Sequence, residues 1–563
     1  MERNRLTGRQ AAARCCPGVG IVLVLVGLCL QGGCKPQSDN SSPDSPESAP
    51  AATPREVWKV QYIKGTKVGY GRTTSREIDR AGRRLIEIEG LDHLTVKRFG
   101  ETTEQKVRFT CTETPDGTLI DFQTELAMGP VPLLSKGRVE GNELIIETTT
   151  QGKTSTTRIP WSADYGGFQA TEQTLRRKPL GPGEKRTIHA LMPGFNQVAA
   201  VEMSAGDFQP VKLLTGTYNL LAIDTTITFA GGQSIKGTMW TDRTGEVLKD
   251  RSEAMGLESF QTTKAQALDK TDAGGFDLGL DVTVKVDRPI DRPHDTSRIR
   301  YRVHLADSDP AGAFVAGASQ QVESIDEHTA RITVYALRPD SPAVNPDASS
   351  DPPSDADRLP NNLIQSDDPL IVKMAAEAAG DTKDAWSTAV ALEGYVKRII
   401  KLKDFSQAFA TAAEVARSRV GDCTEHAVLL AALARARKIP ARVAIGLVYM
   451  QGTQSFGYHM WNEVYIGKRW IPLDATLGRG GIGAAHLKLV DSSLEGASAY
   501  SSFLPIVHVA GRLKIEVLDV KGGRAARQRE RDREPGFRDQ YPAGTLTPEF
   551  GTLAPGPCPL TPS

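Results

Sequence analysis

Cysteine is scarce in this chain, and its scarcity excludes a fold held together by disulfides. Only seven cysteines occur among 563 residues, and three of them lie within residues 15–29. The other four are widely separated: Cys34, Cys111, Cys423 and Cys558. Domains that depend on disulfides have more cysteines at short spacings. The fold must therefore rest on hydrophobic cores, and Cys111, which alternates with apolar residues, is predicted to be a buried core thiol.

An excess of charge is also missing. Lysine plus arginine and aspartate plus glutamate each total 68, so the formal net charge is zero. Nucleic-acid-binding domains usually carry a clustered basic excess, so no nucleic-acid partner is expected. The hydrophobic fraction of 39% is typical of a soluble globular protein. The chain is too long for one core, and roughly 150 residues per domain predicts about three domains.

The apolar run near the N-terminus is too short to cross a bilayer as a helix. It extends from Val19 to Leu30 after an arginine-rich lead-in, whereas a spanning helix needs roughly 20 residues. This arrangement is typical of a secretory signal peptide, predicted here at residues 1–34. The segment from Leu30 to Cys34 resembles the lipobox of bacterial lipoproteins, with Gln31 where that family prefers leucine.

The lipobox resemblance implies that Cys34 becomes the lipidated first residue of the mature protein. The membrane would then be a partner through the N-terminus. Two alternatives to lipidation remain: secretion without a lipid, and an N-terminal segment that is not cleaved and anchors the chain in the membrane. All three interpretations place the rest of the chain outside the cytoplasm, in the periplasm or at the cell surface.

Composition and periodicity divide the chain into segments. Short runs of β-branched and aromatic residues separated by turn signals predict strands, whereas apolar residues three and four apart predict helices. The predicted order is a signal peptide at 1–34, a disordered linker at 35–55, a β-rich domain at 56–270, a smaller β-rich domain at 271–338, a linker at 339–368, a mixed helix-and-strand domain at 369–520 and a disordered tail at 521–563.

A buried helix is predicted to begin at Cys423. Asp422 followed three residues later by Glu425 is typical of a capping box, with aspartate in place of serine or threonine. Apolar residues follow at helical spacing, and Pro440 stops the helix. At the first helical position, unpaired N–H groups and the positive end of the helix dipole favour a thiolate. The pKa of Cys423 is therefore predicted to be lowered.

A β-hairpin with the two-residue turn Gly467-Lys468 is predicted further along the chain. Pairing outward from this turn opposes Trp461 to Asp474. His459 and Asp474 then point to the same face as diagonal neighbours, within side-chain reach. A carboxylate in that place could hold the imidazole in one tautomer and orientation, as a catalytic triad requires.

The runs GDCTEHAVLLAALARARKIPAR and GYHMWNEVYIGKRWIPLDAT closely resemble the bacterial transglutaminase-like superfamily, which has a papain-like α+β fold. The resemblance extends over about residues 369–515. It implies that Cys423 is the nucleophile, His459 the general base and acid, and Asp474 the residue that orients the imidazole. The fold class predicted for the chain is a β-rich N-terminal half followed by a papain-like α+β transglutaminase-like domain.

The implied activity is that of a cysteine peptidase, amidase or acyltransferase on peptide or protein amide bonds. A thioester on Cys423 would pass its acyl group to water or to an amine. The backbone N–H of Cys423 is a natural oxyanion donor. Trp386 and Gln407 are candidates for a second donor by residue type alone. No cofactor and no metal are required by this chemistry, and neither the substrate nor the oligomeric state follows from the sequence.

Three other interpretations remain open at the level of sequence. Cys423 could be a buried thiol in a helix that merely packs. Cys423, His426 and His459 could ligate zinc, because residues three apart on a helix share a side. Finally, the triad could be intact but idle, in a domain that serves as an extracytoplasmic binding or scaffold module.

Overall fold

The structure is a computed structural model that describes residues 54–127, 132–150, 152–270, 275–306, 308–342, 351–401, 410–495 and 499–522. The predicted signal peptide, the lipidation site Cys34, Cys558 and nearly all of the predicted linker at 35–55 and tail at 521–563 lie outside these ranges. Within the described part of the chain, no helix is long and apolar enough to span a membrane.

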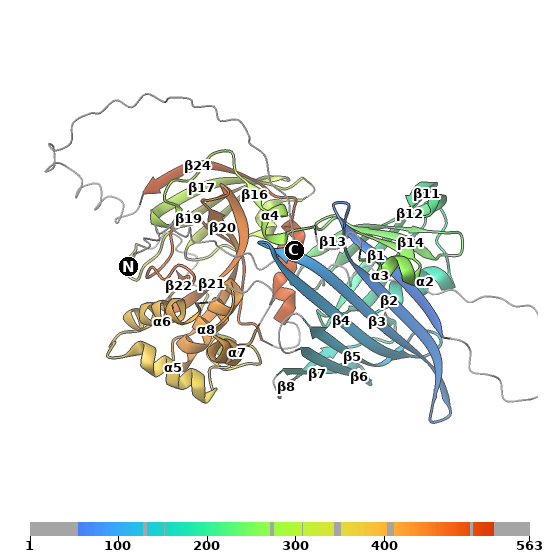
Figure 1. Cartoon of the computed structure of the whole chain (residues 1–563), viewed down its shortest axis with the longest axis horizontal. Coiled ribbons are helices and arrows are strands. Elements are labelled where there is room, and N and C mark those ends of the chain that lie inside the picture. Colours follow the sequence, from blue (N-terminus) through green and yellow to red (C-terminus); the bar gives the residue numbers. More distant parts are fainter. Residues whose placement is uncertain are drawn as a thin grey trace, which may run out of the picture.

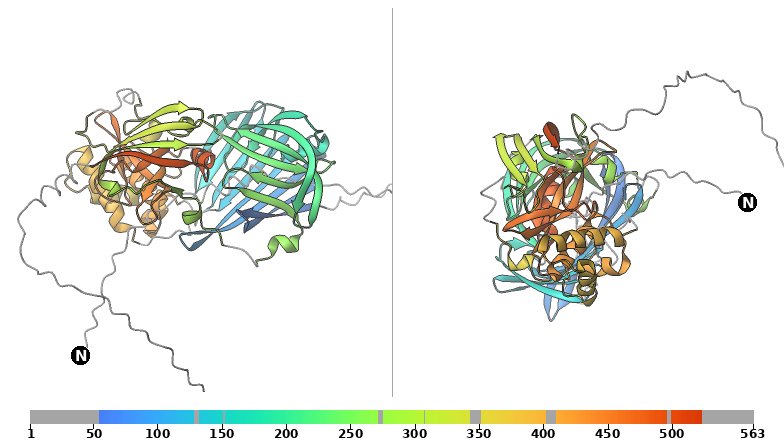
Figure 2. Two further views of the ribbon diagram at one scale, coloured as in Figure 1. Left: turned by 90° about the horizontal axis from the view of Figure 1, so that it is seen from above. Right: turned by 90° about the vertical axis from the view of Figure 1, so that its left-hand side faces the viewer.

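The N-terminal half forms one 15-stranded sheet, here called the front sheet, which confirms that this half is β-rich. Neighbouring strands are antiparallel except for β9 beside β10. Its strands are β1 (Arg55–Ile63), β2 (Thr66–Arg80), β3 (Arg83–Arg98), β4 (Glu101–Glu113), β5 (Leu119–Ala127), β6 (Leu133–Glu140), β7 (Glu143–Thr150), β8 (Lys153–Pro160), β9 (Tyr165–Gly166), β10 (Lys185–Met192), β11 (Gln197–Leu213), β12 (Gly216–Thr228), β13 (Ser234–Thr241), β14 (Val247–Ser252) and β15 (Leu257–Thr262). Figure 2 shows that this sheet curves strongly.

Alternation of apolar and polar residues explains these strands. In β13, every second residue is buried, because successive side chains of a strand point to opposite faces. Cys111 on β4 is fully buried beside Phe109 and Phe122, so the prediction of a core thiol is confirmed. Helices α2 (Ala170–Arg177) and α3 (Lys264–Leu268) lie along this half of the chain.

The C-terminal half contains a 5-stranded sheet, here called the C-terminal sheet. It consists of β16 (Val284–Lys285), β20 (Ala441–Met450), β21 (Ser455–Ile466), β22 (Arg469–Leu473) and β23 (His486–Ser492). Helix α8 packs on β20 and β21, and the other three helices of this region pack around α8 (Figure 1). The helices are α5 (Pro369–Ala379), α6 (Ala385–Ile399), α7 (Ala412–Ser418) and α8 (Cys423–Ala436).

A third sheet crosses the predicted boundaries between domains. Strands β17 (Thr296–His304), β18 (Gln320–Asp326) and β19 (Thr329–Tyr335) come from the predicted smaller β-rich domain. Their sheet is completed by β24 (Lys514–Gly522), which pairs with β17 from beyond the C-terminal sheet. Strand β16, from the same predicted domain, pairs with β21. Residues 271–338 therefore share sheets with the following domain. Helices α4 (Leu278–Asp281) and α9 (Leu504–Val509) complete the described elements of regular helix.

The predicted linker at 339–368 differs from its expected form over the residues described from 351 onward. Leu363 and Ile364 are buried in the core of the C-terminal half. Asn361 stabilises this turn, because its side-chain oxygen accepts hydrogen bonds from the backbone N–H groups of both residues. Most residues around this apolar pair are polar, so the segment has the composition of a linker. Burial of the pair nevertheless packs the segment into the domain.

The tip of the β3–β4 hairpin joins the front sheet to the C-terminal half (Figure 1). Phe99 and Gly100 form its turn with φ of 51° and 89°. Their backbone N–H groups donate to the carboxylate of Asp277, at 2.9 and 2.8 Å. Beside them, Arg98 forms a fully buried ion pair with Asp422. The front sheet therefore contacts the residue that immediately precedes Cys423.

Candidate active site

The predicted helix start at Cys423 is confirmed. Asp422 is the N-cap of α8: its Oδ1 accepts from the backbone N–H of Thr424 at 2.9 Å, and Glu425 accepts from the backbone N–H of Asp422 at 2.8 Å. The Asp422 side chain also accepts from the backbone N–H of Glu425, so the reciprocal capping box predicted from the sequence is present. Cys423 is the first helical residue and its exposed fraction is 0%. The thiol therefore lies at the positive end of a buried helix.

A second carboxyl group lies just inside the same helix end. Burial, followed by repulsion from Asp422, raises the pKa of Glu425 to about 8. Its side chain also accepts a hydrogen bond from the backbone N–H of Ala410 and lies 3.0 Å from the hydroxyl oxygen of Thr424. Near neutral pH, Glu425 therefore adds little negative charge at the end of the helix that carries the thiol.

The predicted hairpin register is also confirmed. Ile466 is opposite Arg469, and the pairing continues to Asn462 opposite Leu473. Gly467 and Lys468 both have positive φ, 59° and 62°. Positive φ at both central positions is characteristic of the type I′ turn, whose twist suits a two-residue hairpin. Strand β22 ends at Leu473, so Asp474 follows the last paired residue.

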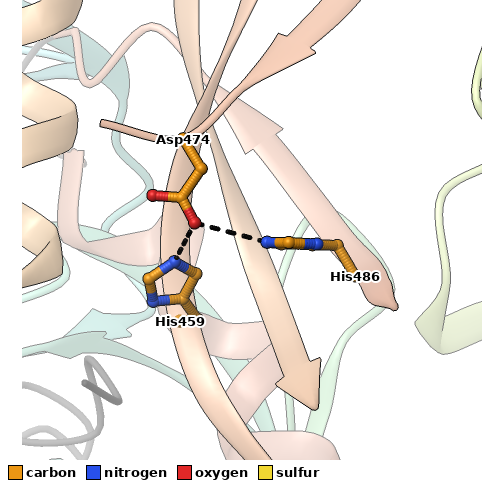
Figure 3. Close-up of side chains that lie close together, drawn as sticks. All are labelled: His459, Asp474 and His486. Carbon is orange, nitrogen blue, oxygen red and sulfur yellow. Dashed lines mark hydrogen bonds and ion pairs between the residues drawn. The ribbon is translucent and has the colours of Figure 1, made fainter. Parts of the chain in front are cut away.

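His459 and Asp474 meet as the register predicts. Nε2 of His459 lies 2.8 Å from Oδ2 of Asp474 (Figure 3). Oδ1 of the same carboxylate accepts from the backbone N–H and the hydroxyl of Thr476, at 2.8 and 2.6 Å. Both side chains are buried, with exposed fractions of 0% and 1%. Burial alone would raise the pKa of Asp474, but the charge and hydrogen bonds of His459 and His486 outweigh it and hold that pKa well below its usual range.

A second histidine contacts the same carboxylate oxygen, and the sequence did not indicate it. His486 begins β23, and its Nε2 lies 3.3 Å from Oδ2 of Asp474. Strands β21 and β23 lie on either side of β20, where Gly446 is opposite His459 and Val448 is opposite His486. Both histidines therefore share a face of the sheet. The only sequence signal is a histidine at the start of an alternating run, which does not reveal its neighbours.

A buried glutamate from α6 also holds the aspartate segment. Oε1 of Glu393 accepts from the backbone N–H of Asp474 at 3.1 Å, and Oε2 accepts from that of Gly480 at 2.7 Å. Burial, partly offset by the bond from Gly480, raises the pKa of Glu393 to about 7. The chain after β22 is thus tied to the helical layer through its backbone.

The zinc set considered from sequence is not the one that the fold gathers. His426 uses Nδ1 to contact the backbone carbonyl of Asp422, one turn earlier in its own helix. Among the described residues, ligand atoms of His459, Asp474 and His486 lie within 4.8 Å of one another. Imidazole and carboxylate are zinc ligands in general. Here, however, a metal would have to displace both Nε2 protons, which the carboxylate already accepts.

The candidates for a second oxyanion donor differ in what the structure shows. Trp386, near the start of α6, is half-buried and packs against the hydrophobic core. Gln407 lies outside the described residues. The structure therefore adds no support for either residue as a donor.

Comparison with known families agrees with this geometry. Residues 372–475 match the Transglutaminase-like superfamily. The chain carries a transglutaminase-like domain. The matched segment contains Cys423, His459 and Asp474. Members of this superfamily are generally cysteine-dependent enzymes. No curated protein sequence matches the chain.

Two solved structures are similar to parts of the chain. A candidate cysteine protease from Cytophaga hutchinsonii is 19% identical, with a TM-score of 0.26, over 40% of this chain and 86% of that protein. The periplasmic domain of TgpA from Pseudomonas aeruginosa, bound to ethylmercury, is 16% identical, with a TM-score of 0.21, over 35% of this chain and 83% of that domain.

Proposed function

We propose that this protein is a transglutaminase-like thiol enzyme that acts on peptide or protein amide bonds outside the cytoplasm. Cys423 is the nucleophile, His459 the general base and acid, and Asp474 the residue that orients the imidazole. The observation that carries the proposal is the buried bond of 2.8 Å between His459 and Asp474, within the segment that matches the family. Helix α8, which begins at Cys423, packs on the strand that carries His459.

The chemistry follows from the roles of the two ring nitrogens. Because Nε2 of His459 donates to Asp474, Nδ1 is the nitrogen assigned to the thiol. The thiolate of Cys423 attacks the amide carbonyl carbon, and the backbone N–H of Cys423 stabilises the oxyanion. The imidazolium then protonates the amide nitrogen, the C–N bond breaks, and an amine leaves behind a thioester.

The second half of the reaction regenerates the enzyme. Neutral His459 takes a proton from an incoming water or amine, whose oxygen or nitrogen attacks the thioester carbon. The C–S bond breaks and releases an acid or a new amide, with the thiolate and imidazolium restored. A papain-like arrangement, with α8 packed on β20 and β21, suits this sequence of steps. No step needs a cofactor.

The rival function is an extracytoplasmic binding or scaffold module with an idle triad. Two observations favour it: the exposed fractions of Cys423, His459 and Asp474 are at most 1%, and the front sheet is larger than the matched domain. The two functions differ in one measurable property. An enzyme needs an ionised thiol, whereas a scaffold needs only a packed one.

The test is the rate of alkylation of Cys423 against pH, followed by peptide mass spectrometry. The midpoint of this curve reports the pKa of the thiol, and the plateau at high pH reports access. The enzyme proposal expects a midpoint well below about 8.5, the usual thiol pKa, that moves toward it in His459→Ala. Cys111 is the internal reference, because burial and then Glu113 raise its pKa well above the usual value.

A matched control guards against general effects of removing a histidine. His93 in the front sheet also contacts a carboxylate, with Nε2 at 3.3 Å from Glu104. His93→Ala should leave the Cys423 midpoint unchanged. An ordinary midpoint in the wild type would favour the scaffold. A lowered midpoint would justify screening peptide amides with and without hydroxylamine, because hydroxamate products report transfer to an amine and carboxylic acids report hydrolysis.

A further inference from the structure

Two histidines share one carboxylate oxygen at the centre of the site. Figure 3 shows the rings of His459 and His486 approaching the same oxygen of Asp474 from different directions. The two Nε2 atoms lie 2.8 and 3.3 Å from that oxygen. The side chains of His486 and Asp474 are 0% and 1% exposed, so both are shielded from bulk water.

We propose that His486 is a positioning residue of the catalytic centre: its Nε2–H holds Oδ2 of Asp474 in the place where His459 needs it. This inference rests on the proposed function, because it assigns His486 a role in orienting the imidazole that serves Cys423. His486 acts through Asp474 and does not touch the reacting atoms.

The bonding of the carboxylate determines the tautomers. An ionised carboxylate only accepts hydrogen bonds, so both histidines must donate through Nε2. Thr476 donates twice to the other oxygen. With donors on both oxygens, Asp474 cannot rotate about its terminal bond without losing bonds on both sides. His486 supplies the donor that would be missing if His459 alone contacted Oδ2.

The surroundings of His486 keep it a neutral donor. Burial lowers its pKa, with an opposing contribution from the bond to Asp474. On its other side lies His294, with ring centroids 5.8 Å apart, and burial followed by His486 lowers the pKa of His294 to about 4. Trp461 packs edge-on against His486 at 5.3 Å. Arg479, in the loop before β23, disfavours protonation of His294, whereas the carboxylate of Asp474 favours it.

Neutrality matters for the proposed chemistry. The ring of His486 lies 6.0 Å from that of His459. A positive charge at this distance would oppose protonation of His459 and so weaken a thiolate–imidazolium pair. A neutral Nε2–H orients Asp474 without that penalty.

Gly446 makes this arrangement possible. It lies on β20 between the strands that carry the two histidines, and it has no side chain to occupy the shared face. A Cβ there would lie 2.0 Å from the backbone oxygen of Leu487, the residue after His486. The close approach of β20 and β23 therefore requires glycine.

The test compares His486→Phe, which removes the donor, with His486→Gln, which keeps an N–H donor. The readout is the pH midpoint of Cys423 alkylation. Loss of a hydrogen bond to a charged group typically costs roughly 10- to 100-fold in an equilibrium constant. We expect alkylation near pH 6 to fall about tenfold or more in His486→Phe and to remain within about threefold of wild type in His486→Gln. The control His93→Gln should change neither the midpoint nor the rate.

Each outcome separates this inference from the proposed function. An ordinary Cys423 midpoint in the wild type would refute the function itself. A lowered midpoint that is the same in folded His486→Phe would refute the positioning role alone. Because His486→Phe could fail to fold, ¹⁵N-histidine NMR of the full wild-type chain provides a second measurement. It should show His486 as the Nε2–H tautomer at neutral pH, and the Nδ1–H tautomer would overturn the proposal.

Discussion

Replacing Arg98 with methionine is expected to destabilise the start of α8, although Arg98 lies 324 positions before the N-cap Asp422 in the sequence. Arg98 comes from the end of β3, and its guanidinium pairs with the N-cap Asp422. The two side chains are 1% and 0% exposed. Removing one partner of a buried pair leaves the other charge without compensation, which typically costs about 3–5 kcal/mol.

The magnitude here should lie near the lower end of that range. After the substitution, Asp422 would still accept hydrogen bonds from the backbone N–H and hydroxyl of Thr424, both at 2.9 Å. We therefore expect Arg98→Met to lower the free energy of unfolding of this region by about 3 kcal/mol. Asp422→Asn keeps a good N-cap but leaves Arg98 without its counter-charge, so a similar loss is expected.

The double variant Arg98→Met/Asp422→Asn decides whether the pair is coupled. With both charges removed, we expect the free energy of unfolding to fall by at least about 2 kcal/mol less than the sum of the falls in the two single variants. The assay is denaturant unfolding of the full chain, together with amide hydrogen exchange in peptides that cover α8. The exchange measurement isolates this helix, because a chain of several domains need not unfold in one step.

An exposed pair in the front sheet provides the matched control. Arg76 on β2 contacts Glu87, with side-chain exposures of 51% and 19%. Arg76→Met should cost at most about 1 kcal/mol and should not alter exchange in α8. A loss in the double variant that equals the sum of the two single losses of unfolding free energy within about 0.5 kcal/mol would refute the reasoning. The effects of independent sites add, whereas those of coupled sites do not.

Three further predictions concern the domain around the site. Lys438, just after α8, has φ of 61°, so Lys438→Gly should raise the free energy of unfolding by up to about 1 kcal/mol in a denaturant titration. Since burial raises the pKa of Glu393 from 4.5 to about 7, the folded chain holds an extra proton between these values, and stability should fall as pH rises through them. This fall, about 3 kcal/mol, should be missing in Glu393→Gln when unfolding is measured at pH 5 and pH 8, and an equal slope in both proteins would contradict it. Gly446→Ala places a Cβ 2.0 Å from a backbone oxygen, so it should cost at least about 1–3 kcal/mol and slow Cys423 alkylation. An unchanged free energy of unfolding together with an unchanged alkylation rate would show that β20 and β23 can separate freely.

The parts of the site that the sequence predicted are those set by local geometry. A capping box needs residues three apart, so Asp422 and Glu425 indicate where α8 begins. A two-residue turn sets the register of its hairpin, so Gly467-Lys468 is enough to place His459 near Asp474.

The fold of the front half was predictable only in class. Alternation shows that a segment is a strand with one buried face, but it does not name the neighbouring strand. The 15 strands of the front sheet and the return of β24 to β17 therefore follow only from the tertiary structure. The same reason explains why residues 271–338 share their sheets with the domain that follows.

The remaining members of the site come from elements that no local rule connects to it. His486 reaches Asp474 because β23 pairs with β20, and Glu393 does so because α6 packs in the same domain. Arg98 arrives from the front sheet, where its sequence neighbours indicate only a strand end. Spacing along the chain thus determined where the helix begins at Cys423 and that His459 lies beside Asp474. Only the packing of distant elements decided which buried groups hold Asp474 and the start of the helix, because such contacts depend on strand partners that alternation does not specify.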